Sequence, residues 1–311
     1  FDSLKHALPR LDWVIPSWLY LDGPNLDFKT NIDSRSLNYM RVHKPGVAIL
    51  PTLQNVSQSK WNGPGLAKLL ADPGRREKLT NDIVSFLAAN KLQGVTIDFE
   101  DVPASAHPDL ETFLTHLSQI FAPHGWIIVQ AAPFDDNDWP YRAYSQIVDY
   151  TLLMAYDEHD ESGPAGSIAA QGWYEKILDK RMRELPADST IVALASYAYD
   201  WVNKGPAVSL GFHDAMGAAR DAGAIVQFDA ATNNPHFAYR EGDGTSHDVW
   251  LLDAATAFNQ IHAADHYQPA GYALWRLGVE DPTVLPLMGQ RYNLPAPANR
   301  APPMRVARTR K

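Results

Sequence analysis

The sequence predicts an α/β protein built as a (β/α)8 barrel, and three observations support this fold class. Short apolar strands alternate with amphipathic helices along the 311 residues, as expected for a parallel sheet covered by helices. Charged, amide and aromatic residues follow five or more of these strands, and the carboxyl ends of barrel strands are where active sites form. Neither G-x-G-x-x-G nor G-x-x-x-x-G-K-[ST] occurs, so a doubly wound nucleotide-binding sheet is not indicated.

The predicted strands are short and apolar, and they span residues 11–21, 46–53, 94–100, 126–132, 150–156, 190–197 and 271–277. The predicted helices carry apolar residues at helical spacing, and they span residues 1–8, 33–42, 75–90, 108–121, 141–147, 171–185, 213–222, 253–263 and 282–290. Leu79, Ile83 and Phe86 illustrate that spacing in the third helix. Gly125 lies just past the end of the fourth, where glycine commonly ends a helix.

Two segments fall outside the barrel pattern. Residues 225–228, 236–240 and 248–252 predict short antiparallel strands around a turn at 242–244, that is, a small insertion (about 224–252) between strands seven and eight. Residues 293–311 are rich in Pro, Ala and Arg without periodicity, and we interpret them as a tail or linker. The barrel itself is expected within residues 1–292.

Composition limits the possible function. The net charge of −9 argues against a nucleic-acid partner, which requires basic surfaces. The chain has no cysteine, so disulfides, thiolate catalysis and Cys-type zinc sites are excluded. No apolar run is long enough to cross a bilayer, and no signal segment opens the chain. Nine Trp and thirteen Tyr are a generous supply of rings, which sugar-binding clefts use, although core packing explains many of them.

The strand at 94–100, GVTIDFE, contains the most unusual pattern in the chain. Alternation along a strand places Thr96, Asp98 and Glu100 on one face. The two carboxylates then lie roughly 7 Å apart along the strand. Such a pair favours mutual pKa shifts and general acid catalysis, although acids at a strand end also cap helices.

Four motifs together resemble the glycoside hydrolases of family 18. That family carries D-x-x-D-x-D-x-E on its fourth strand, and Asp98 and Glu100 match its last two acids. Its M-x-Y-D motif on strand six resembles residues 154–157, which include Tyr156 and Asp157. Its Y-x-Y segment resembles residues 197–199, and its strand-eight tryptophan resembles Trp275. The motifs occur in the family's order across nearly the whole chain, and the similarity is greatest to the branch with spore peptidoglycan hydrolases.

The resemblance implies a role for each catalytic residue. Glu100 would protonate the departing glycosidic oxygen and later act as base toward water. Asp98 would orient the substrate's own 2-acetamido group, whose oxygen attacks the anomeric carbon in place of an enzyme nucleophile. Tyr156 would hold the acetamido oxygen and Asp157 the sugar hydroxyls. Trp275 would form the floor of the cleaved-sugar subsite. Further substrate contacts are expected from Tyr197, Trp201, Trp139, Gln130 and Trp18.

Two departures from the family pattern accompany this match, one in the motif acids and one in the number of strands. Gln93 and Thr96 stand where the family has acids, which leaves the sugar identity open. Only two predicted strands precede Glu100, which should end the fourth, so the first barrel strand would precede Phe1 or the barrel is open there. His159 follows Asp157 and Glu158, but no second His lies at metal-ligand spacing, so neither a metal nor a cofactor is expected.

The implied function is a retaining glycoside hydrolase, active on β-linked N-acetylglucosamine-containing polysaccharide and able to transglycosylate. One alternative is a hydrolase or transglycosylase for an exopolysaccharide or glucan that lacks the acetamido group. Another is a non-catalytic sugar-binding module on the same fold. The resemblance also extends to modules fused to polysaccharide deacetylase and membrane glycosyltransferase modules, so such partners and a periplasmic or extracellular location are expected.

Overall fold

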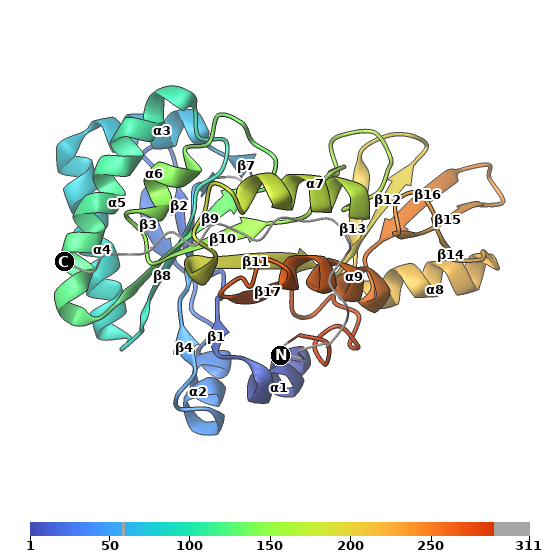
Figure 1. Ribbon diagram of the computed structural model, residues 1–311, viewed down its shortest axis with the longest axis horizontal. Coiled ribbons are helices and arrows are strands. Elements are labelled where there is room, and N and C mark those ends of the chain that lie inside the picture. Colours follow the sequence, from blue (N-terminus) through green and yellow to red (C-terminus); the bar gives the residue numbers. More distant parts are fainter. Residues whose placement is uncertain (58–59, 289–311) are drawn as a thin grey trace. The chain divides into compact units, whose positions relative to one another are not determined.

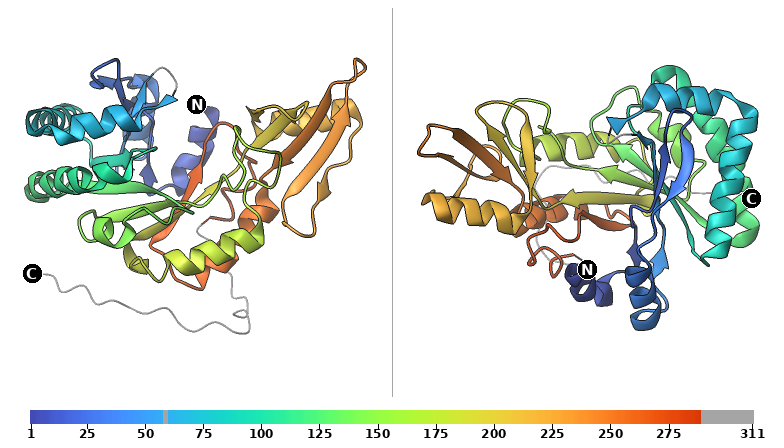
Figure 2. Two further views of the ribbon diagram at one scale, coloured as in Figure 1. Left: turned by 90° about the horizontal axis from the view of Figure 1, so that it is seen from above. Right: turned by 180° about the vertical axis from the view of Figure 1, so that it is seen from behind.

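The computed structural model describes residues 1–57 and 60–288, and they divide into two compact units (Figures 1 and 2). One unit comprises residues 6–152. The other comprises residues 1–5 and the described residues from 153 onward. The strand β10 (Tyr150–Met154) crosses the boundary between them along the chain. The predicted tail at 293–311 lies outside the described residues. No helix of the described chain is long and apolar enough to span a membrane.

The unit of residues 6–152 is built on a mainly parallel sheet with the order β3-β2-β5-β8-β9. Parallel pairs join β2 to β5, β5 to β8 and β8 to β9, whereas β3 pairs antiparallel with β2. Two short parallel strands, β1 and β4, precede β2 and β5. The bounds are β1 Trp13–Val14, β2 Leu19–Asp22, β3 Asp27–Thr30, β4 Ala48–Ile49, β5 Thr52–Gln54, β6 Val56–Ser57, β7 Lys60–Trp61, β8 Gly94–Asp98 and β9 Ile127–Pro133.

Helices cover the apolar face of this sheet, with α3, α4 and α5 grouped on one side (Figure 1). The helix α4 begins where the Asp72 side chain accepts hydrogen bonds from two backbone N–H groups of its first turn. The helix α5 buries Leu110, Phe113, Leu114 and Leu117, and the Phe113 ring lies 6.4 Å from that of Phe99. The helices are α2 Ser34–His43, α3 Gly63–Ala71, α4 Pro73–Ala89, α5 His107–Phe121 and α6 Tyr141–Ser145.

The second unit contains a parallel pair and an antiparallel sheet. The strand β11 (Thr190–Ala195) pairs in parallel with β17 (Gly271–Trp275). The helices α7 (Gln171–Arg181) and α9 (Ala254–Asp265) belong to this unit, as do the first four residues of the short α1 (Asp2–Ala7). The antiparallel sheet has the order β13-β12-β16-β15-β14, and α8 (Phe212–Ala222) packs against one face through Ala215 and Ala219. Its strands are β12 Ala198–Val202, β13 Ala207–Leu210, β14 Gln227–Phe228, β15 Pro235–Arg240 and β16 Ser246–Leu251.

The structure corrects several predicted elements. Pro16 and Pro51 break the predicted strands at 11–21 and 46–53 into β1 with β2 and β4 with β5, because proline cannot donate to a ladder. The segment 55–65, which lies between a predicted strand and a predicted helix, contains β6, β7 and the start of α3. Residues 282–288 form turns instead of the predicted helix, and Asp281 Oδ1 accepts from Thr283 in an Asx-type turn.

Candidate active site

The strand β8 ends at Asp98, and the Asp98 side chain is buried beside the neighbouring strand β5. Asp98 is 7% exposed, and its Oδ2 accepts a hydrogen bond of 2.7 Å from Gln54 Nε2 on the neighbouring strand β5. Its Oδ1 is buried and has no hydrogen-bond partner among the described residues. Burial raises the pKa of Asp98 from 3.8 to about 6, although the Gln54 bond acts in the opposite direction. This carboxylate therefore titrates near neutral pH and retains one oxygen for another donor.

Glu100 follows two residues later and is half-buried. Its backbone N–H donates to Asn55 Oδ1 at 2.9 Å, and its backbone carbonyl accepts from Asn55 Nδ2 at 2.8 Å. Asn55 comes directly after Gln54 and is fully buried. Two consecutive amides at the end of β5 thus contact the segment that carries both acids.

Gln93 and Thr96, which replace acids of the family motif, have structural roles. Gln93 Oε1 accepts from the backbone N–H of Ile49 at 2.9 Å, and Thr96 Oγ1 donates to the carbonyl of Leu50 at 3.1 Å. Both side chains therefore bond β8 to the β4–β5 segment. The hydrogen bond that Asp98 receives comes from Gln54.

In the other unit, Asp157 accepts hydrogen bonds from two tyrosines. Tyr197 and Tyr199 both donate to its Oδ1, the latter at 3.2 Å. The backbone of Asp157 is left-handed, with φ of 62°, and the residue keeps contact with solvent. Burial of the carboxylate nevertheless raises the pKa of Asp157 to about 6, against the lowering effect of both hydroxyls. Burial and the nearby Asp157 also raise the pKa of Tyr197 and of Tyr199.

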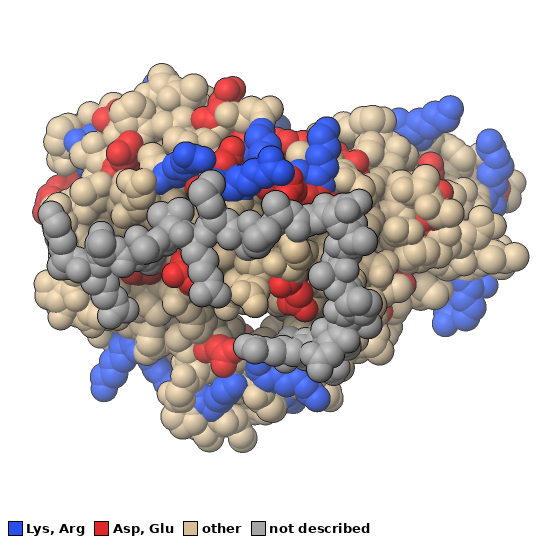
Figure 3. Space-filling model, in the orientation of Figure 1, with Lys and Arg blue, Asp and Glu red and all other residues tan. Residues whose placement is uncertain are grey.

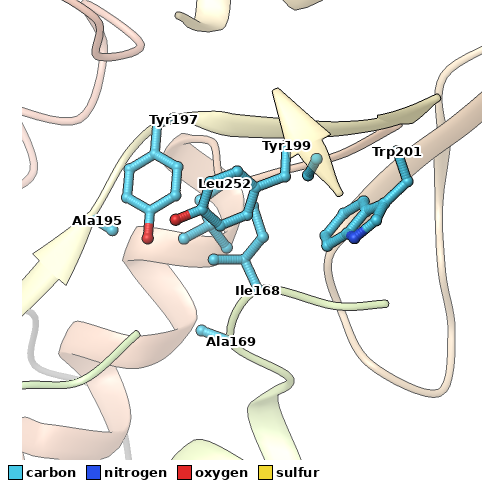
Figure 4. Packing of buried hydrophobic residues seen from close by; sticks show 8 residues of the cluster. Ile168, Ala169, Ala195, Tyr197, Tyr199, Trp201 and Leu252 are labelled. Carbon is cyan, nitrogen blue, oxygen red and sulfur yellow. The ribbon is translucent and has the colours of Figure 1, made fainter. Parts of the chain in front are cut away.

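These tyrosines belong to a buried apolar cluster (Figure 4). In Figure 4 the rings of Tyr197, Tyr199 and Trp201 stand in a row along one chain segment, above Ile168 and Ala169. Trp275 and Tyr156 are half-buried and pack against the same cluster. Tyr156, Asp157, Tyr197 and Trp275, all predicted as site residues, therefore lie around one core.

Trp201 is almost fully buried, at 1% exposed, and its indole N–H donates to the carbonyl of Gly163. Trp139 is buried with its ring 5.3 Å from His107 and 5.5 Å from Tyr144. Neither indole presents an open face in this structure, so their predicted sugar contacts stay predictions. Trp18 is also buried. Pro16 interrupts the predicted strand at 11–21, and Trp18 therefore lies directly before β2.

Gln130 does not share a face with Asp98. It pairs in register with Ile97, the residue before Asp98, and neighbouring residues of a strand point to opposite faces. Gln130 is 1% exposed, and its Oε1 has no hydrogen-bond partner among the described residues. This geometry does not support the substrate contact predicted for Gln130.

Gln54, Asn55 and Tyr199 contact predicted site residues, although no sequence motif predicted a role for them. Gln54 and Asn55 directly follow an apolar strand, which is the signal that identified Asp98 and Glu100. A glutamine and an asparagine carry no charge, however, and neither belongs to the family motif. Tyr199 is the second tyrosine of the Y-x-Y segment, and its contact with Asp157 depends on tertiary structure.

No metal site is evident in the part of the chain that the structure describes. No group of three or more His, Cys, Asp or Glu side chains there could hold a metal ion. His159 Nδ1 lies 2.8 Å from the carbonyl of Ser167. Positive and negative side chains are interspersed on the face shown in Figure 3.

A parallel sheet covered by helices, with acids at the end of a strand, is the arrangement of an α/β enzyme. The model of the glycosyl hydrolases of family 18 matches residues 11–280, and the chain belongs to that family. It is similar to the chitinase from Chromobacterium violaceum ATCC 12472, with a TM-score of 0.84 at 21% identity over 93% of this chain and 95% of that one. This likeness confirms the predicted TIM-barrel-like fold.

Two proteins of Bacillus subtilis strain 168 are related in sequence. YdhD, named as a sporulation-specific glycosylase, is 25% identical over 242 residues, which are 74% of this chain and 58% of YdhD. The cortical fragment-lytic enzyme is also 25% identical over 242 residues, or 73% of this chain. The chain spans 56% of the length of that enzyme. These relatives agree with the branch that the motifs indicate.

Proposed function

We propose that this chain is a retaining glycoside hydrolase for β-linked N-acetylglucosamine-containing polysaccharide. The observation that carries the proposal is the end of β8. There Asp98 has a buried carboxylate with one unpartnered oxygen, and Glu100 follows two residues later on a backbone fixed by Asn55. A general acid needs a defined position, and an acetamido N–H needs a buried acceptor.

The reaction would proceed in two steps. Glu100 donates its proton to the glycosidic oxygen while the substrate's acetamido oxygen bonds to the anomeric carbon, which gives an oxazolinium intermediate and the free leaving sugar. Glu100, now a carboxylate, then removes a proton from water, whose oxygen bonds to the same carbon and opens the ring with net retention. A sugar hydroxyl in place of water would give transglycosylation.

Asp98 would accept the acetamido N–H with its unpartnered Oδ1 and offset the positive charge of the oxazolinium ring. This role requires the carboxylate form. Because its pKa is raised to about 6, the reactive form would predominate above that pH. Asp157 would accept sugar hydroxyls, Tyr156 would donate to the acetamido oxygen, and Trp275 would stack on the apolar face of the sugar.

The names of the relatives support this substrate class. Chitin, implied by the chitinase, is a polymer of β-linked N-acetylglucosamine, and the cortical fragment-lytic enzyme is named for cortex fragments. Such polysaccharides lie outside the cytoplasm, so we propose a periplasmic or extracellular site of action. Fusion to, or association with, deacetylase and glycosyltransferase modules is part of the same proposal.

The decisive test uses Glu100→Gln with defined N-acetylglucosamine oligosaccharides and product analysis by mass spectrometry. We expect a loss of about 10²- to 10⁴-fold in kcat, the usual contribution of a general acid. Wild-type turnover by this variant would refute the role of Glu100. A thiazoline analogue of the oxazolinium ring should inhibit the wild-type protein. Turnover of a glucan without such inhibition would instead support a substrate that lacks the acetamido group.

A further inference from the structure

The segment that carries Glu100 is fixed by side-chain hydrogen bonds in place of a strand ladder. The strand β5 ends at Gln54 and β8 ends at Asp98, and these two residues are register partners. Beyond them, the Asn55 amide bonds to both the N–H and the carbonyl of Glu100, at 2.9 and 2.8 Å. One side chain therefore satisfies both backbone polar groups of Glu100 and continues the contact between the two strands by two residues.

Asn55 is itself tightly held. It is fully buried, and its own carbonyl accepts from the N–H of Asn62 at 2.9 Å. Asn62 caps the helix α3 by accepting from the N–H of Gly65 with its side chain. The amide that contacts Glu100 is thus attached to both a sheet strand and a helix start.

The chain turns sharply directly after Glu100. Asp101 has a left-handed backbone, with φ of 53°. Its carbonyl oxygen would lie only 1.7 Å from a Cβ added at Gly63, the first residue of α3. Only glycine allows this approach, so the start of α3 limits where the Asp101 carbonyl can lie. Asn55 holds the preceding residue, Glu100, through its backbone.

We propose that Asn55 is a positioning residue for the general acid. By bonding to both backbone groups of Glu100, it fixes the Cα of that residue and the direction in which the carboxyl group points. The inference rests on the proposed role of Glu100 as proton donor. A shift of about 1 Å in a catalytic group can reduce the rate on the order of 10²-fold. The two hydrogen bonds from Asn55 therefore affect the rate at which Glu100 protonates the glycosidic oxygen.

A misplaced acid lowers kcat/KM unequally for two kinds of substrate, whereas general destabilisation lowers it equally. Cleavage of an unactivated oligosaccharide needs full protonation of the leaving oxygen, whereas a dinitrophenyl glycoside leaves with little help. Asn55→Ala should therefore lower kcat/KM for the oligosaccharide by about 10²-fold and for the dinitrophenyl glycoside by less than about 10-fold. Loss of folded protein alone would lower both equally.

The chain offers a matched control. Asn234 is also fully buried, and its side chain bonds to both the N–H and the carbonyl of Ala169, at 3.0 and 2.9 Å. Asn234→Ala thus removes the same pair of bonds from a residue that carries no acid. It should lower the melting temperature comparably and reduce kcat/KM for the two substrates by the same factor.

Two further variants keep the test decisive if Asn55→Ala does not fold. Asn55→Asp keeps an acceptor for the Glu100 N–H, loses the donor to its carbonyl and places a carboxyl group against that carbonyl. Gly63→Ala moves Asp101 without touching Asn55. Both should show the larger loss on the oligosaccharide, and parallel losses on the two substrates in all folded variants would overturn the inference.

The outcome also separates this inference from the proposed function. In a Glu100→Gln background, Asn55→Ala should cause little further loss on the oligosaccharide, since no acid remains to be positioned. Full activity of Glu100→Gln would refute the proposed function. A strongly reduced but measurable activity of Glu100→Gln, together with an additive effect of Asn55→Ala, would refute only the positioning role.

Discussion

Gln54 donates a 2.7 Å hydrogen bond to the carboxylate of Asp98 from the register-paired position on the neighbouring strand. In the family motif an acid stands two residues before this aspartate, and here that position is Thr96, which bonds to the carbonyl of Leu50. Asp98 therefore has a neutral donor as its hydrogen-bond partner. A donor stabilises the carboxylate form, whereas a second acid would repel it.

Gln54→Leu should move the acidic limb of the pH–rate profile upward. The hydrogen bond from Gln54 lowers the pKa of Asp98 and burial raises it, with a result of about 6. Without the bond the pKa rises, so a higher pH is needed to ionise Asp98. The measurement is kcat/KM between pH 4 and 8. Gln93→Leu removes an amide that bonds to Ile49 and should leave the limb in place. An unmoved limb in Gln54→Leu would contradict the ionised role of Asp98.

Asp98→Asn should stabilise the fold at neutral pH and abolish activity. The folded-state pKa of about 6 exceeds the ordinary value of 3.8, so ionised Asp98 destabilises the native state. The destabilisation is absent below pH 4, grows as pH rises, and is complete above pH 6, where it amounts to about 3 kcal/mol. Denaturant unfolding at pH 3.5 and pH 7.5 measures it. Equal effects of the substitution at both pH values would disprove this linkage.

Tyr197→Phe should raise the pKa of Asp157 further. The Tyr197 hydroxyl donates to the Asp157 carboxylate and lowers its pKa, while burial raises it. Side-chain carboxyl NMR titration of the variant should show a later midpoint than in the wild type. Tyr267→Phe is the control, because Tyr267 donates to the carboxylate of Asp179 at 2.9 Å in the contact between the Tyr267 loop and α7. That variant should leave the Asp157 midpoint unchanged, and an unchanged midpoint in Tyr197→Phe would contradict the contribution of the Tyr197 hydroxyl.

Trp275→Ala should raise KM more than it lowers kcat. Trp275 is half-buried against the cluster of Tyr197 and Tyr199 and retains ring surface for a sugar. A ring contact is worth on the order of 1 kcal/mol beyond area burial, so we expect about a 10-fold rise in KM for oligosaccharides. Trp126→Ala removes a half-buried ring that stacks on His124 and should leave KM unchanged. A fall in kcat alone would instead indicate a role in core packing.

The sequence was sufficient to predict the fold class because the periodic signals are strong. Seven apolar strands and most helices occur where the patterns place them. Of the antiparallel sheet, β14, β15 and β16 lie within the predicted insertion, whereas β12 and β13 precede it and were not predicted. The errors were local. Pro16 and Pro51 divide two predicted strands, and the short helix α3 was hidden by its Gly- and Pro-rich first turn.

The candidate site was less predictable, because charge is easier to recognise than hydrogen-bond geometry. Asp98 and Glu100 stand out as charged residues at the end of an apolar strand. The amides of Gln54 and Asn55 matter only through their partners Asp98 and Glu100, which are 44 and 45 residues away in sequence. Alternation along β9 also placed Gln130 on the opposite face from Asp98, a consequence of register that the sequence alone does not give.

The hydrogen bond between Asn62 and Asn55 has a consequence for protein engineering. It joins the two residues that flank the segment 56–61. The backbone of Glu100 is bonded to one of these flanking residues, Asn55. Substitutions within this segment that keep Asn55, Asn62 and Gly63 should therefore leave the position of Glu100 unchanged, so the sequence of the segment and the position of the acid can be varied separately.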